Sequence, residues 1–559
     1  IMLSQRYNIS LILSKLLSLR KINDDKINLF FNPNINDNLP NPFILKDMTK
    51  SINRSIEAIS KNQKIAIIAD YDVDGSTSLA LLYKFFLSLN LKIICKIPDR
   101  LIEGYGPNQR IMNELKNENV DLIFALDCGT TSFNVFNDHN DKKIDIIVID
   151  HHISEKKFPN IYSIINPNRF DENNNFKDLA SVGLTFLFIM GLRKKLRDLN
   201  YFSKNKKEPN LLINLDLVAL GTICDSVHLS EYNRLFVYEG LEILKKRKNL
   251  GISKIIDNSK ISQTPTSTDL GYIIGPQLNA ASRIDDSTLP SKILISNDSV
   301  EAEKIAKKLF LLNEKRKIIE KNIYDEASKQ ALEQINSKFL IVYGTNWHKG
   351  TLGIIASRLV EKFHKPSFVI SINNNIGTGS VRSIDHIDIG NMILNAKKIG
   401  LLLSGGGHKK AAGLQINYKK MDDFKFFLNN FFDKIDNIYF RKVALYDLKL
   451  SLNEINIDLL ESIERLEPYG NGNEEPKFII SDLSIDRYKI LKEKHLLIFF
   501  KNDLGKNIKG ICFNCIGTKL GENLIHNKNI KYEFGCVVKR DKFGNNLDPQ
   551  LIIQDALIK

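Results

Sequence analysis

Short apolar runs alternate with segments of helical periodicity in the first half of the chain. The runs are KIAIIAD at 64–70, LKIICKIPDR at 91–100, VDLIFALDCG at 120–129 and KIDIIVIDHH at 143–152. Continuous apolar runs of this length predict buried strands, and the segment after the first run predicts a helix near residues 76–90. Strands that alternate with helices indicate a mostly parallel α/β sheet.

The second half of the chain has two further patterns. Residues 299–335 contain no proline or glycine and repeat apolar side chains every three or four positions, which predicts a long amphipathic helix that connects two lobes. KFLIVYGTNW, which begins at residue 338, restarts an α/β pattern. From residue 436 onward, short strand-like runs separated by turn residues predict a small β-barrel: VALYDLKLSL, PKFIISDLSI, HLLIFFK, NIKGICF, NIKYEFGCVV and QLIIQDALI.

These patterns divide the chain into five segments, because 559 residues exceed the size of one core. We expect an N-terminal helical segment packed on the next domain (1–55), an α/β domain (56–296), the connecting helix (297–336), a second α/β domain (337–435) and the barrel (436–559). No apolar stretch approaches the roughly 20 residues that span a bilayer, and the N-terminus lacks the form of a secretory signal. We therefore expect a cytoplasmic monomer without a membrane partner.

Charge and cysteine content change this picture little. The formal charge of +14 suits a polyanionic partner such as nucleic acid, although the general excess of Lys, Asn and Ile is also typical of a biased nucleotide composition. Six scattered cysteines fit a reducing compartment. Cys512 and Cys515 have CxxC spacing, but no second pair or nearby histidine completes a zinc set, so we expect a structural role for them.

Acidic and imidazole side chains gather where the predicted strands end. They are Asp70, Asp72 and Asp74, then Asp127, and then Asp150, His151 and His152. In parallel α/β sheets, ligands bind at the carboxyl ends of the strands, and clustered carboxylates repel each other unless a cation lies among them. Oxygen and imidazole ligands suit Mn²⁺, Mg²⁺ or Zn²⁺. A single aspartate at such a position is more often a helix cap, so the metal prediction depends on the whole set.

Several of these carboxylates could bridge two metal ions about 3.5 to 4 Å apart. Such a pair of ions activates water for an in-line phosphoryl displacement. The set therefore predicts hydrolysis of a phosphate ester. DVDGST, from Asp72 to Thr77, also resembles the start of haloacid-dehalogenase-type phosphatases, in which the first aspartate is a nucleophile. That family has no use for the Asp-His-His triplet at residues 150–152, which argues against it.

Four motifs in order, ADYDVDG, LDCGTTS, VIDHHIS and ALGTICD, resemble the signatures of the DHH phosphoesterases. Further segments are similar to the RecJ exonucleases within that superfamily: FILKDM at 43–48, IPDRLIEGYG at 97–106, GPQLNAASRID at 275–285, WHKGTLGIIASRL at 347–359, SGGGHKKAAG at 404–413 and EPYGNGNEEP at 467–476. The similarity runs over nearly the whole chain. It implies a DHH domain, a DHHA1 domain after the long helix, and a C-terminal OB-fold.

The resemblance implies a two-ion site that takes Mn²⁺ or Mg²⁺. Its expected ligands are Asp72, Asp74, Asp127, His151, His152 and Asp225. Catalytic roles are expected for Asp70, Asp150 and His152. The two aspartates are expected to orient the metal ligands, and Asp70 could also be a direct ligand. Asp216 is expected to be structural.

The same resemblance implies a pocket for a 5′ phosphate. Its expected residues are Arg100, Arg283, Ser380, Arg382, Gly406, Gly407 and His408. Trp347 is either a core residue or a base-stacking one, and the same alternatives hold in the barrel for Tyr469, Phe499, Phe500 and Phe513. The chain departs from the family pattern at Gln277, where an arginine is usual, and at Ser181 and Ser282, where glycine is usual.

The implied function is a 5′-to-3′ exonuclease specific for single-stranded DNA that releases 5′-mononucleotides during DNA recombination and repair. A single-strand-binding protein and a RecQ-type helicase are the protein partners that the resemblance suggests. Two alternatives remain open: a DHH phosphatase or hydrolase of short oligonucleotides, and a DNA-binding scaffold without catalysis.

Overall fold

The computed structural model describes residues 2–137, 144–261, 264–502, 504–526, 530–541 and 548–558. The chain forms two compact units. One comprises Ile1–Leu39, Ser226–Glu239 and Ala444–Lys559, and the other comprises Pro40–Asp225 and Gly240–Val443. Within the described residues, no helix is both long enough and apolar enough to cross a membrane.

The larger unit begins with a five-stranded parallel sheet in the order β2-β1-β3-β4-β5. Its strands are β1 (Ile65–Ala69), β2 (Ile93–Lys96), β3 (Leu122–Leu126), β4 (Asp145–Ile149) and β5 (Ser163–Ile165). All four predicted strands are present. Every residue of β1 and β3 is buried, which explains runs that are continuously apolar rather than alternating.

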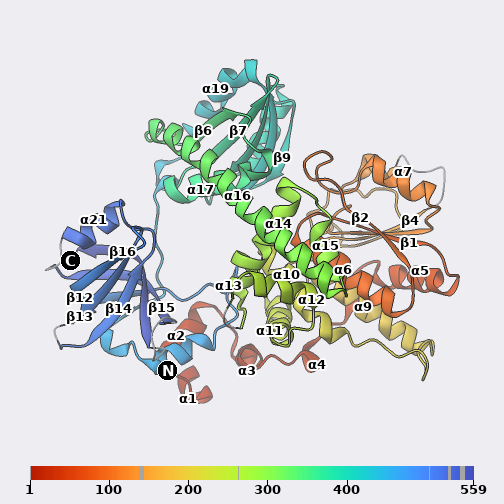
Figure 1. The fold of residues 1–559 in the computed structure, drawn as a ribbon, viewed down its shortest axis with the longest axis horizontal. Helices are drawn as coiled ribbons and strands as arrows, with labels where there is room; N and C mark the ends of the chain where they lie inside the picture. The colour runs from red at the N-terminus through yellow and green to blue at the C-terminus, as the bar shows by residue number, and fades with distance from the viewer. Residues whose placement is uncertain are drawn as a thin grey trace. The chain divides into compact units, whose positions relative to one another are not determined.

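Helices cover both faces of this sheet, with α7 on one side and α5, α6 and α9 on the other (Figure 1). Their bounds are α5 (Met48–Ser60), α6 (Val73–Ser88), α7 (Gln109–Asn117), the short α8 (Phe133–Asn137) and α9 (Ser181–Asp198). Because side chains alternate along a strand, Ala66 and Ile68 point into the core that contains Ile111 of α7. The helix expected near 76–90 begins earlier, at Val73.

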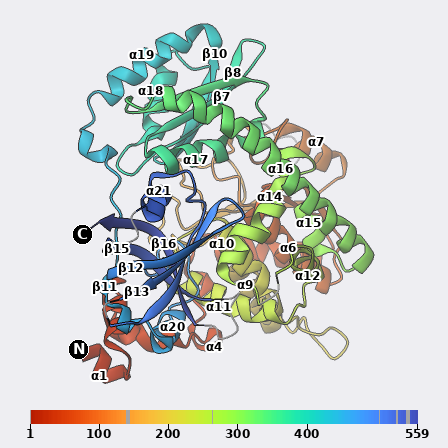
Figure 2. The ribbon, with the colours of Figure 1, turned by 60° about the vertical axis from the view of Figure 1, so that its left-hand side comes forward.

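A group of helices follows and leads into the long connector. They are α10 (Leu215–Cys224), α11 (Glu231–Lys245), α12 (Leu250–Asn258), α13 (Ser267–Asp269), α14 (Gly275–Ile284), α15 (Leu289–Ile295) and α16 (Ser299–Glu333). The predicted long helix is therefore confirmed. Figure 2 shows α16 passing along α14 and α15 and reaching α17.

The second sheet of this unit has the order β6-β7-β8-β10-β9. Its elements are β6 (Leu340–Thr345), α17 (Leu352–Phe363), β7 (Ser367–Asn373), β8 (Ile376–Arg382), α18 (Ile389–Lys398), β9 (Ser404–His408), β10 (Ala411–Asn417) and α19 (Met421–Phe432). Trp347 is a core residue here, because it is 5% exposed and its Nε1 donates a hydrogen bond to Glu326 Oε2 at 2.9 Å.

The smaller unit contains the predicted barrel. Its strand order is β11-β12-β13-β14-β16-β15, and β12 also pairs with β15, which closes the sheet. The elements are β11 (Leu448–Leu450), α20 (Ile457–Glu464), β12 (Phe478–Leu491), β13 (His495–Lys501), β14 (Asn507–Cys512), α21 (Lys519–His526), β15 (Tyr532–Arg540) and β16 (Pro549–Ile558).

The N-terminal helices belong to this smaller unit, which corrects the prediction that residues 1–55 pack together on the DHH domain. They are α1 (Met2–Tyr7), α2 (Leu11–Leu19), α3 (Ile27–Phe31) and α4 (Ile35–Asn38). Leu13 and Leu17 of α2 share a core with Leu459 and Ile463 of α20. Only the part from Pro40 onward belongs to the DHH unit. An amphipathic pattern shows that a helix has a buried face, but it does not show which partner covers that face.

Candidate metal centre and phosphate pocket

Three adjacent strands deliver carboxylates to one edge of the parallel sheet. Asp70, Asp127 and Asp150 directly follow β1, β3 and β4, and each is at most 2% exposed. The Asp70 amide donates to Leu126 O at 3.2 Å, and the Asp127 amide donates to Ile149 O at 2.9 Å. Because neighbouring strands lie about 4.8 Å apart, this pairing brings the three aspartates together, as the sequence pattern predicted.

Asp72 and Asp74 reach the same place through the start of α6. Asp72 is the N-cap, and its Oδ1 accepts the Gly75 amide at 3.0 Å. The buried carboxylate of Asp74 accepts the backbone amides of Ser181, at 2.7 Å, and Val182, at 2.9 Å. A Cβ on Gly75 would lie 2.4 Å from the Asp70 carbonyl oxygen, so only glycine permits this close turn.

Asp127 has a left-handed backbone conformation, with φ of 58°. Such conformations are uncommon for residues other than glycine and often occur at functional sites. The Ser181 hydroxyl donates to Asp127 Oδ1 at 3.0 Å. Ser181 is one of the positions at which the chain departs from the family pattern, where glycine is usual. The structure gives Ser181 a direct hydrogen bond to a predicted metal ligand.

Asp150 orients the histidine pair. Its buried carboxylate accepts the amides of Thr130, His151 and His152 and lies 2.7 Å from His152 Nδ1. Such a carboxylate contact fixes the position of an imidazole and leaves the other ring nitrogen to bind elsewhere. The geometry agrees with the orienting role predicted for Asp150.

Three polar residues that sequence reasoning missed support the same segment. Asn166 Nδ2 donates to the His152 carbonyl at 2.8 Å, and Asn168 Nδ2 donates to the His151 carbonyl at 2.7 Å. Tyr105 Oη donates to the Asp127 carbonyl at 2.8 Å and lies 3.1 Å from His152 Nδ1. Asn166 and Asn168 belong to the segment INPNRF after β5, and the EGYG segment contains Tyr105. No local pattern relates either segment to the histidines.

The ligand atoms form three overlapping groups, within each of which they lie no more than 4.8 Å apart. The groups are Asp70, Asp72 and Asp127; Asp74, His151 and Asp225; and Asp127, His151 and His152. Asp70 Oδ1 and His151 Nε2 are buried and have no hydrogen-bond partner in the part of the chain that the structure describes. Buried polar atoms without partners are costly, so this donor set fits divalent cations. Asp225 reaches it as the C-cap of α10.

Electrostatics within the cluster also favours a cation. Burial and then the charges of neighbouring aspartates raise the pKa of Asp70, Asp74 and Asp127. Burial would lower the pKa of His152, but the adjacent Asp150 raises it to about 9. Burial would raise the pKa of Asp150, but the charge and hydrogen bond of His152, together with the charge of His151 and the Thr130 hydrogen bond, outweigh burial and lower that pKa. The carboxylates of Asp70, Asp74 and Asp127 therefore lie where a nearby positive charge is needed to make their full ionisation favourable.

The raised carboxyl pKa values predict a pH-dependent response to Mn²⁺. A carboxyl group whose pKa is higher in the folded state than in the unfolded state lowers the stability of the fold as the pH rises. This loss of stability begins near the unfolded-state pKa and is complete above the folded-state pKa. Metal binding displaces the protons and removes this penalty. The rise in Tm caused by Mn²⁺ relative to EDTA is therefore expected to increase as the pH rises above about 4, the pKa of an aspartate in an unfolded chain. Differential scanning fluorimetry tests this, and a pH-independent shift would contradict the assigned cluster.

A cationic cavity of about 340 Å³ lies in the same unit as the metal centre. Four of its lining residues are cationic and none is acidic. The lining consists of Arg100, Arg283, Lys349, Gly350, Gly353, Ile354, Ser357, Ser380 and Arg382. Four of the seven residues predicted for the 5′-phosphate pocket therefore line it. Lys349 and Gly353 belong to the RecJ-like segment at 347–359, and the sequence predicts no role for either residue.

The polar groups of this pocket have fixed positions. Arg283 Nη1 donates to the Gly350 carbonyl at 2.9 Å, and Arg382 Nη1 donates to Ser380 Oγ at 3.2 Å. A Cβ on Gly353 would lie 3.0 Å from Arg382 Nη2. Burial, and then the nearby Arg100, lower the pKa of Arg283 to about 9 and also lower the pKa of Arg382. Cations gathered without acidic partners in the lining are stabilised by an anion.

Gly406, Gly407 and His408 do not line this cavity. They lie in β9, and β10 separates β9 from β8. Gly413 of β10 pairs with Ser380 of β8 on one side and with Gly406 of β9 on the other. Two strand spacings place the Gly406 backbone about 10 Å from that of Ser380. The glycine-rich pattern indicated exposed backbone amides, but the order of the strands places these amides outside the cationic cavity.

The other departures from the family pattern lie outside the pocket. Gln277 is buried, and its Nε2 donates to Ser259 Oγ at 2.6 Å and to the Ile273 carbonyl at 3.2 Å. Ser282 Oγ donates to the Asn279 carbonyl at 3.3 Å within α14. Neither residue lines the cationic cavity, so neither departure removes a charge from it.

Three family models match the chain. They are the DHH family N-terminal domain at residues 64–222, the DHHA1 domain at 336–434 and the RecJ OB domain at 446–555. The single-stranded-DNA-specific exonuclease RecJ of Haemophilus influenzae is 31% identical over 528 residues, which cover 92% of this chain and 91% of that protein. The chain belongs to the RecJ family.

Two solved RecJ structures are similar to the model. RecJ of Thermus thermophilus in complex with Mn²⁺ is 24% identical, with a TM-score of 0.83 over 99% of this chain and 77% of that one. An exonuclease RecJ bound to manganese is 28% identical, with a TM-score of 0.61 over 72% of this chain and 98% of that one. The predicted α/β fold and the predicted family are thus confirmed.

The RecJ OB domain contains a cross-strand row of polar and aromatic side chains. Arg487 of β12, Phe499 of β13 and Lys509 of β14 are register partners, and the Arg487 guanidinium lies 4.6 Å from the Phe499 ring centroid. Of the other candidate stacking residues, Phe500 is fully buried, Tyr469 is partly buried against the same core, and Phe513 is 51% exposed. Phe499 and Phe513 therefore remain the candidates for base stacking.

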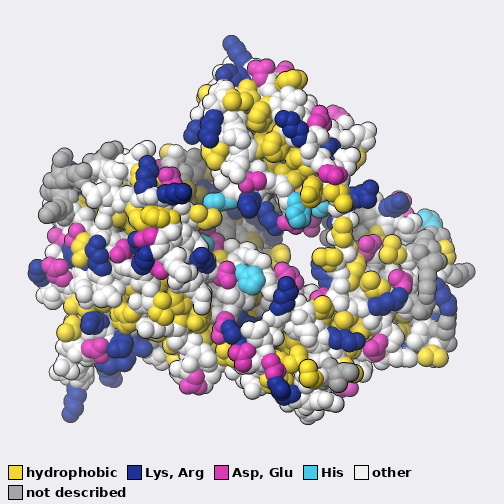
Figure 3. All heavy atoms as spheres, turned by 180° about the vertical axis from the view of Figure 1, so that it is seen from behind, with side chains coloured by type: hydrophobic (Ala, Val, Ile, Leu, Met, Phe, Trp, Pro, Cys, Tyr) yellow, Lys and Arg dark blue, Asp and Glu magenta, His cyan; other side chains and the backbone are white. Residues whose placement is uncertain are grey.

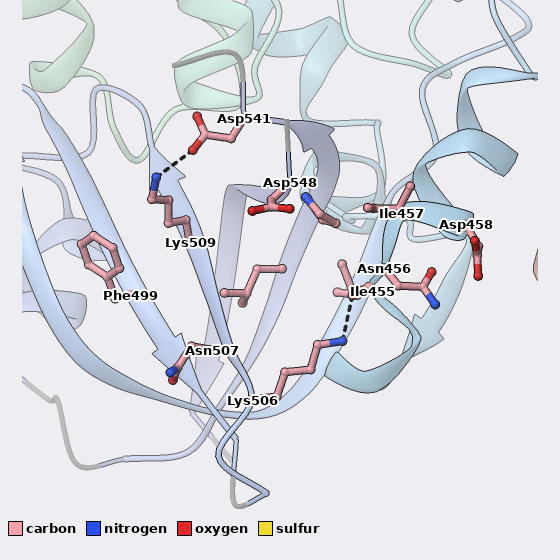
Figure 4. Close-up of a pocket in the computed structure, with 12 residues that line it drawn as sticks. Ile455, Asn456, Ile457, Asp458, Phe499, Lys506, Asn507, Lys509, Asp541 and Asp548 are labelled. Carbon is pink, nitrogen blue, oxygen red and sulfur yellow. Dashed lines mark hydrogen bonds and ion pairs between the residues drawn. The ribbon is translucent and has the colours of Figure 1, made fainter. Parts of the chain in front are cut away.

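The cavity beside this row, of about 750 Å³, is not a simple basic groove (Figure 4). Lys509 Nζ donates to Asp541 Oδ2 at 2.8 Å, and Lys506 Nζ donates to the Ile455 carbonyl at 2.9 Å. Figure 3 shows Lys and Arg side chains dispersed among Asp and Glu over the face in view. The net charge of this RecJ-family chain is thus not gathered into one stripe on that face.

Proposed function

We propose that this chain removes nucleotides one at a time from the 5′ end of single-stranded DNA, releases 5′-mononucleotides, and acts in DNA recombination and repair. The observation that carries the proposal is the position of the cationic pocket beside the metal centre. Tyr71 connects them, because it lies between Asp70 and Asp72 in the chain and its ring is 4.7 Å from the Arg100 guanidinium.

Two Mn²⁺ or Mg²⁺ ions, when bound, supply an activated water for attack at phosphorus and neutralise the leaving oxygen. The residues that would hold them are Asp72, Asp74, Asp127, His151, His152 and Asp225. Asp70 Oδ1 is buried without a hydrogen-bond partner among the described residues, so Asp70 would be a further ligand. Asp150 holds the His152 ring, and the first amides of α9 hold Asp74. Pre-oriented ligands of this kind need little rearrangement when the ions bind.

The cationic pocket accounts for polarity. A terminal phosphate monoester has more charge and more acceptor oxygens than an internal diester, so it gains most from Arg100, Arg283, Arg382 and Ser380. With that phosphate in the pocket, the next phosphate along the strand faces the carboxylate cluster. Gly406, Gly407 and His408 would contact the strand outside the pocket.

The barrel supports a single strand as substrate, because Phe499 beside Arg487 offers an aromatic and cationic surface for successive bases. A single-strand-binding protein and a RecQ-type helicase that supply the substrate, and a cytoplasmic location, stay predictions from the family resemblance.

Digestion of 5′-labelled and 3′-labelled single strands with Mn²⁺ tests activity, strandedness and polarity together. We expect early release of labelled mononucleotide from the 5′-labelled strand, progressive shortening of the 3′-labelled strand, and no digestion of a blunt duplex. Activity confined to dinucleotides or pyrophosphate would instead support the short-substrate hydrolase, and no Mn²⁺-dependent activity would support the non-catalytic scaffold.

A further inference from the structure

A second cavity lies in the larger unit, at the ends of α6 and α10 away from the metal centre. Its volume is about 410 Å³, within the range of small-molecule sites. Lys84 follows the Asp72 cap by three turns of α6, about 18 Å along the helix, and Asn214 precedes α10, whose other end is Asp225. Both helices that hold predicted metal ligands therefore also border this cavity.

The cavity has a positive lining. Lys84 and Lys248 face it, and none of its lining residues is acidic. Among the described residues, Lys84 Nζ has no hydrogen-bond or ion-pair partner, and burial lowers its pKa. The buried Asp216 is the nearby opposite charge, but it does not line the cavity. A largely desolvated ammonium group without a direct partner favours the entry of an anion.

The remaining lining combines free amides with an apolar wall. Asn210 and Asn249 use their side-chain oxygens to cap helices, by accepting the Leu212 amide at 3.0 Å and the Ile252 amide at 3.1 Å. Asn214 and Asn297 make no side-chain hydrogen bond to described residues, so each has both an amide donor and an acceptor available. The rest of the lining is Ser88 and five apolar residues, namely Phe85, Leu87, Pro209, Leu211 and Ile213.

We propose that this cavity binds a nucleoside monophosphate. The two lysines would bind the phosphate dianion, the free amides would pair with the edge of the base, as asparagine does with adenine, and the apolar wall would pack against the sugar and the base. The choice of ligand rests on the proposed function, of which a mononucleotide is the product. The site is separate from the metal centre and from the 5′-phosphate pocket, with which it shares no lining residue.

Calorimetric titration of the full chain with dAMP in EDTA tests the proposal, in an Arg382→Ala background that weakens the 5′-phosphate pocket. We expect binding that Lys248→Glu weakens by about tenfold or more. Lys246→Glu is the matched control, because Lys246 is also exposed and lies two residues away outside the cavity. It is expected to change the Kd by less than about twofold. Absence of binding, or equal weakening by both variants, would overturn the proposal.

Lysine acetylation followed by peptide mass spectrometry locates the bound ligand. Saturating dAMP is expected to reduce acetylation of Lys84 by about threefold or more, as mass action requires for an occupied site, and to leave Lys246 unchanged. Unprotected Lys84, or equal protection by inorganic phosphate and dAMP at the same concentration, would reject a nucleotide site. These measurements need neither metal nor DNA, so their result is independent of the nuclease assay.

Discussion

Replacing Asp225 by asparagine is expected to reduce Mn²⁺-dependent nuclease activity by more than about 100-fold, because loss of even an outer hydrogen-bond partner of a metal ligand costs 10- to 100-fold. Asp225 Oδ2 lies 3.4 Å from His151 Nε2, and its side chain is 22% exposed at the C-terminus of α10. Asparagine keeps the shape of the side chain but removes a negative charge that would bind a divalent cation. Initial rates on 5′-labelled single strands measure the effect, and calorimetry should show one fewer Mn²⁺ bound.

Asp216→Asn is the matched control for this variant. Asp216 lies in the first turn of the same helix, and burial raises its pKa to about 6. Asparagine can still accept the Leu217 amide, which Asp216 Oδ1 accepts at 2.8 Å. We expect nearly normal rates and two bound ions. Equal losses in the two variants would mean that the helix, rather than a ligand, had been damaged, and the assignment of Asp225 would fail.

Replacing Arg382 by alanine is expected to lower kcat/KM for a 5′-phosphorylated single strand by about 10- to 100-fold. A charge-assisted hydrogen bond contributes about 1.5–3 kcal/mol, and about 1.4 kcal/mol corresponds to a factor of ten. Arg382 lies beside Ser380 in the pocket and has no acidic partner in its lining. A strand with a 5′ hydroxyl lacks the terminal phosphate, so its kcat/KM is expected to change by less than about threefold.

The comparison between the two substrates separates phosphate recognition from general damage. Lys410→Ala removes the same charge from the same domain, but Lys410 is 74% exposed and its ion pair with Asp385 lies on the surface. It is expected to affect both substrates little, because exposed ion pairs contribute only about 0–1 kcal/mol. If Arg382→Ala slowed both substrates equally, the cavity would not be the origin of polarity.

The strand-end aspartates illustrate what could be predicted from local pattern. Continuous apolar runs end at Asp70, Asp127 and Asp150, and parallel strands place such ends at one edge of the sheet, so their meeting follows from the alternation of strands and helices. Asp225 was different. It follows an apolar helix without a distinct polar face, and only the family resemblance placed it with the other ligands.

The failures of prediction share a cause. Ser181 is 54 residues from Asp127, whose carboxylate it binds, and Asn168 is 17 residues from His151, whose carbonyl it binds. Gly406 to His408 have the composition of a phosphate loop, but β10 separates them from the pocket. Residues 1–39 show an amphipathic pattern that does not identify the barrel as its partner. Each outcome depends on contacts between distant segments, which local periodicity does not encode.

By itself, the sequence determined the four strands, the long helix, the barrel strands and the carboxylates at the strand ends, because these depend on side-chain periodicity over a few neighbouring residues. The tertiary structure alone decided which ligand atoms lie within 4.8 Å of one another and which arginines share a cavity. It also decided that Lys84 faces a second cavity and has no direct partner among the described residues. Those features depend on strand order and on the docking of helices, which bring together residues hundreds of positions apart.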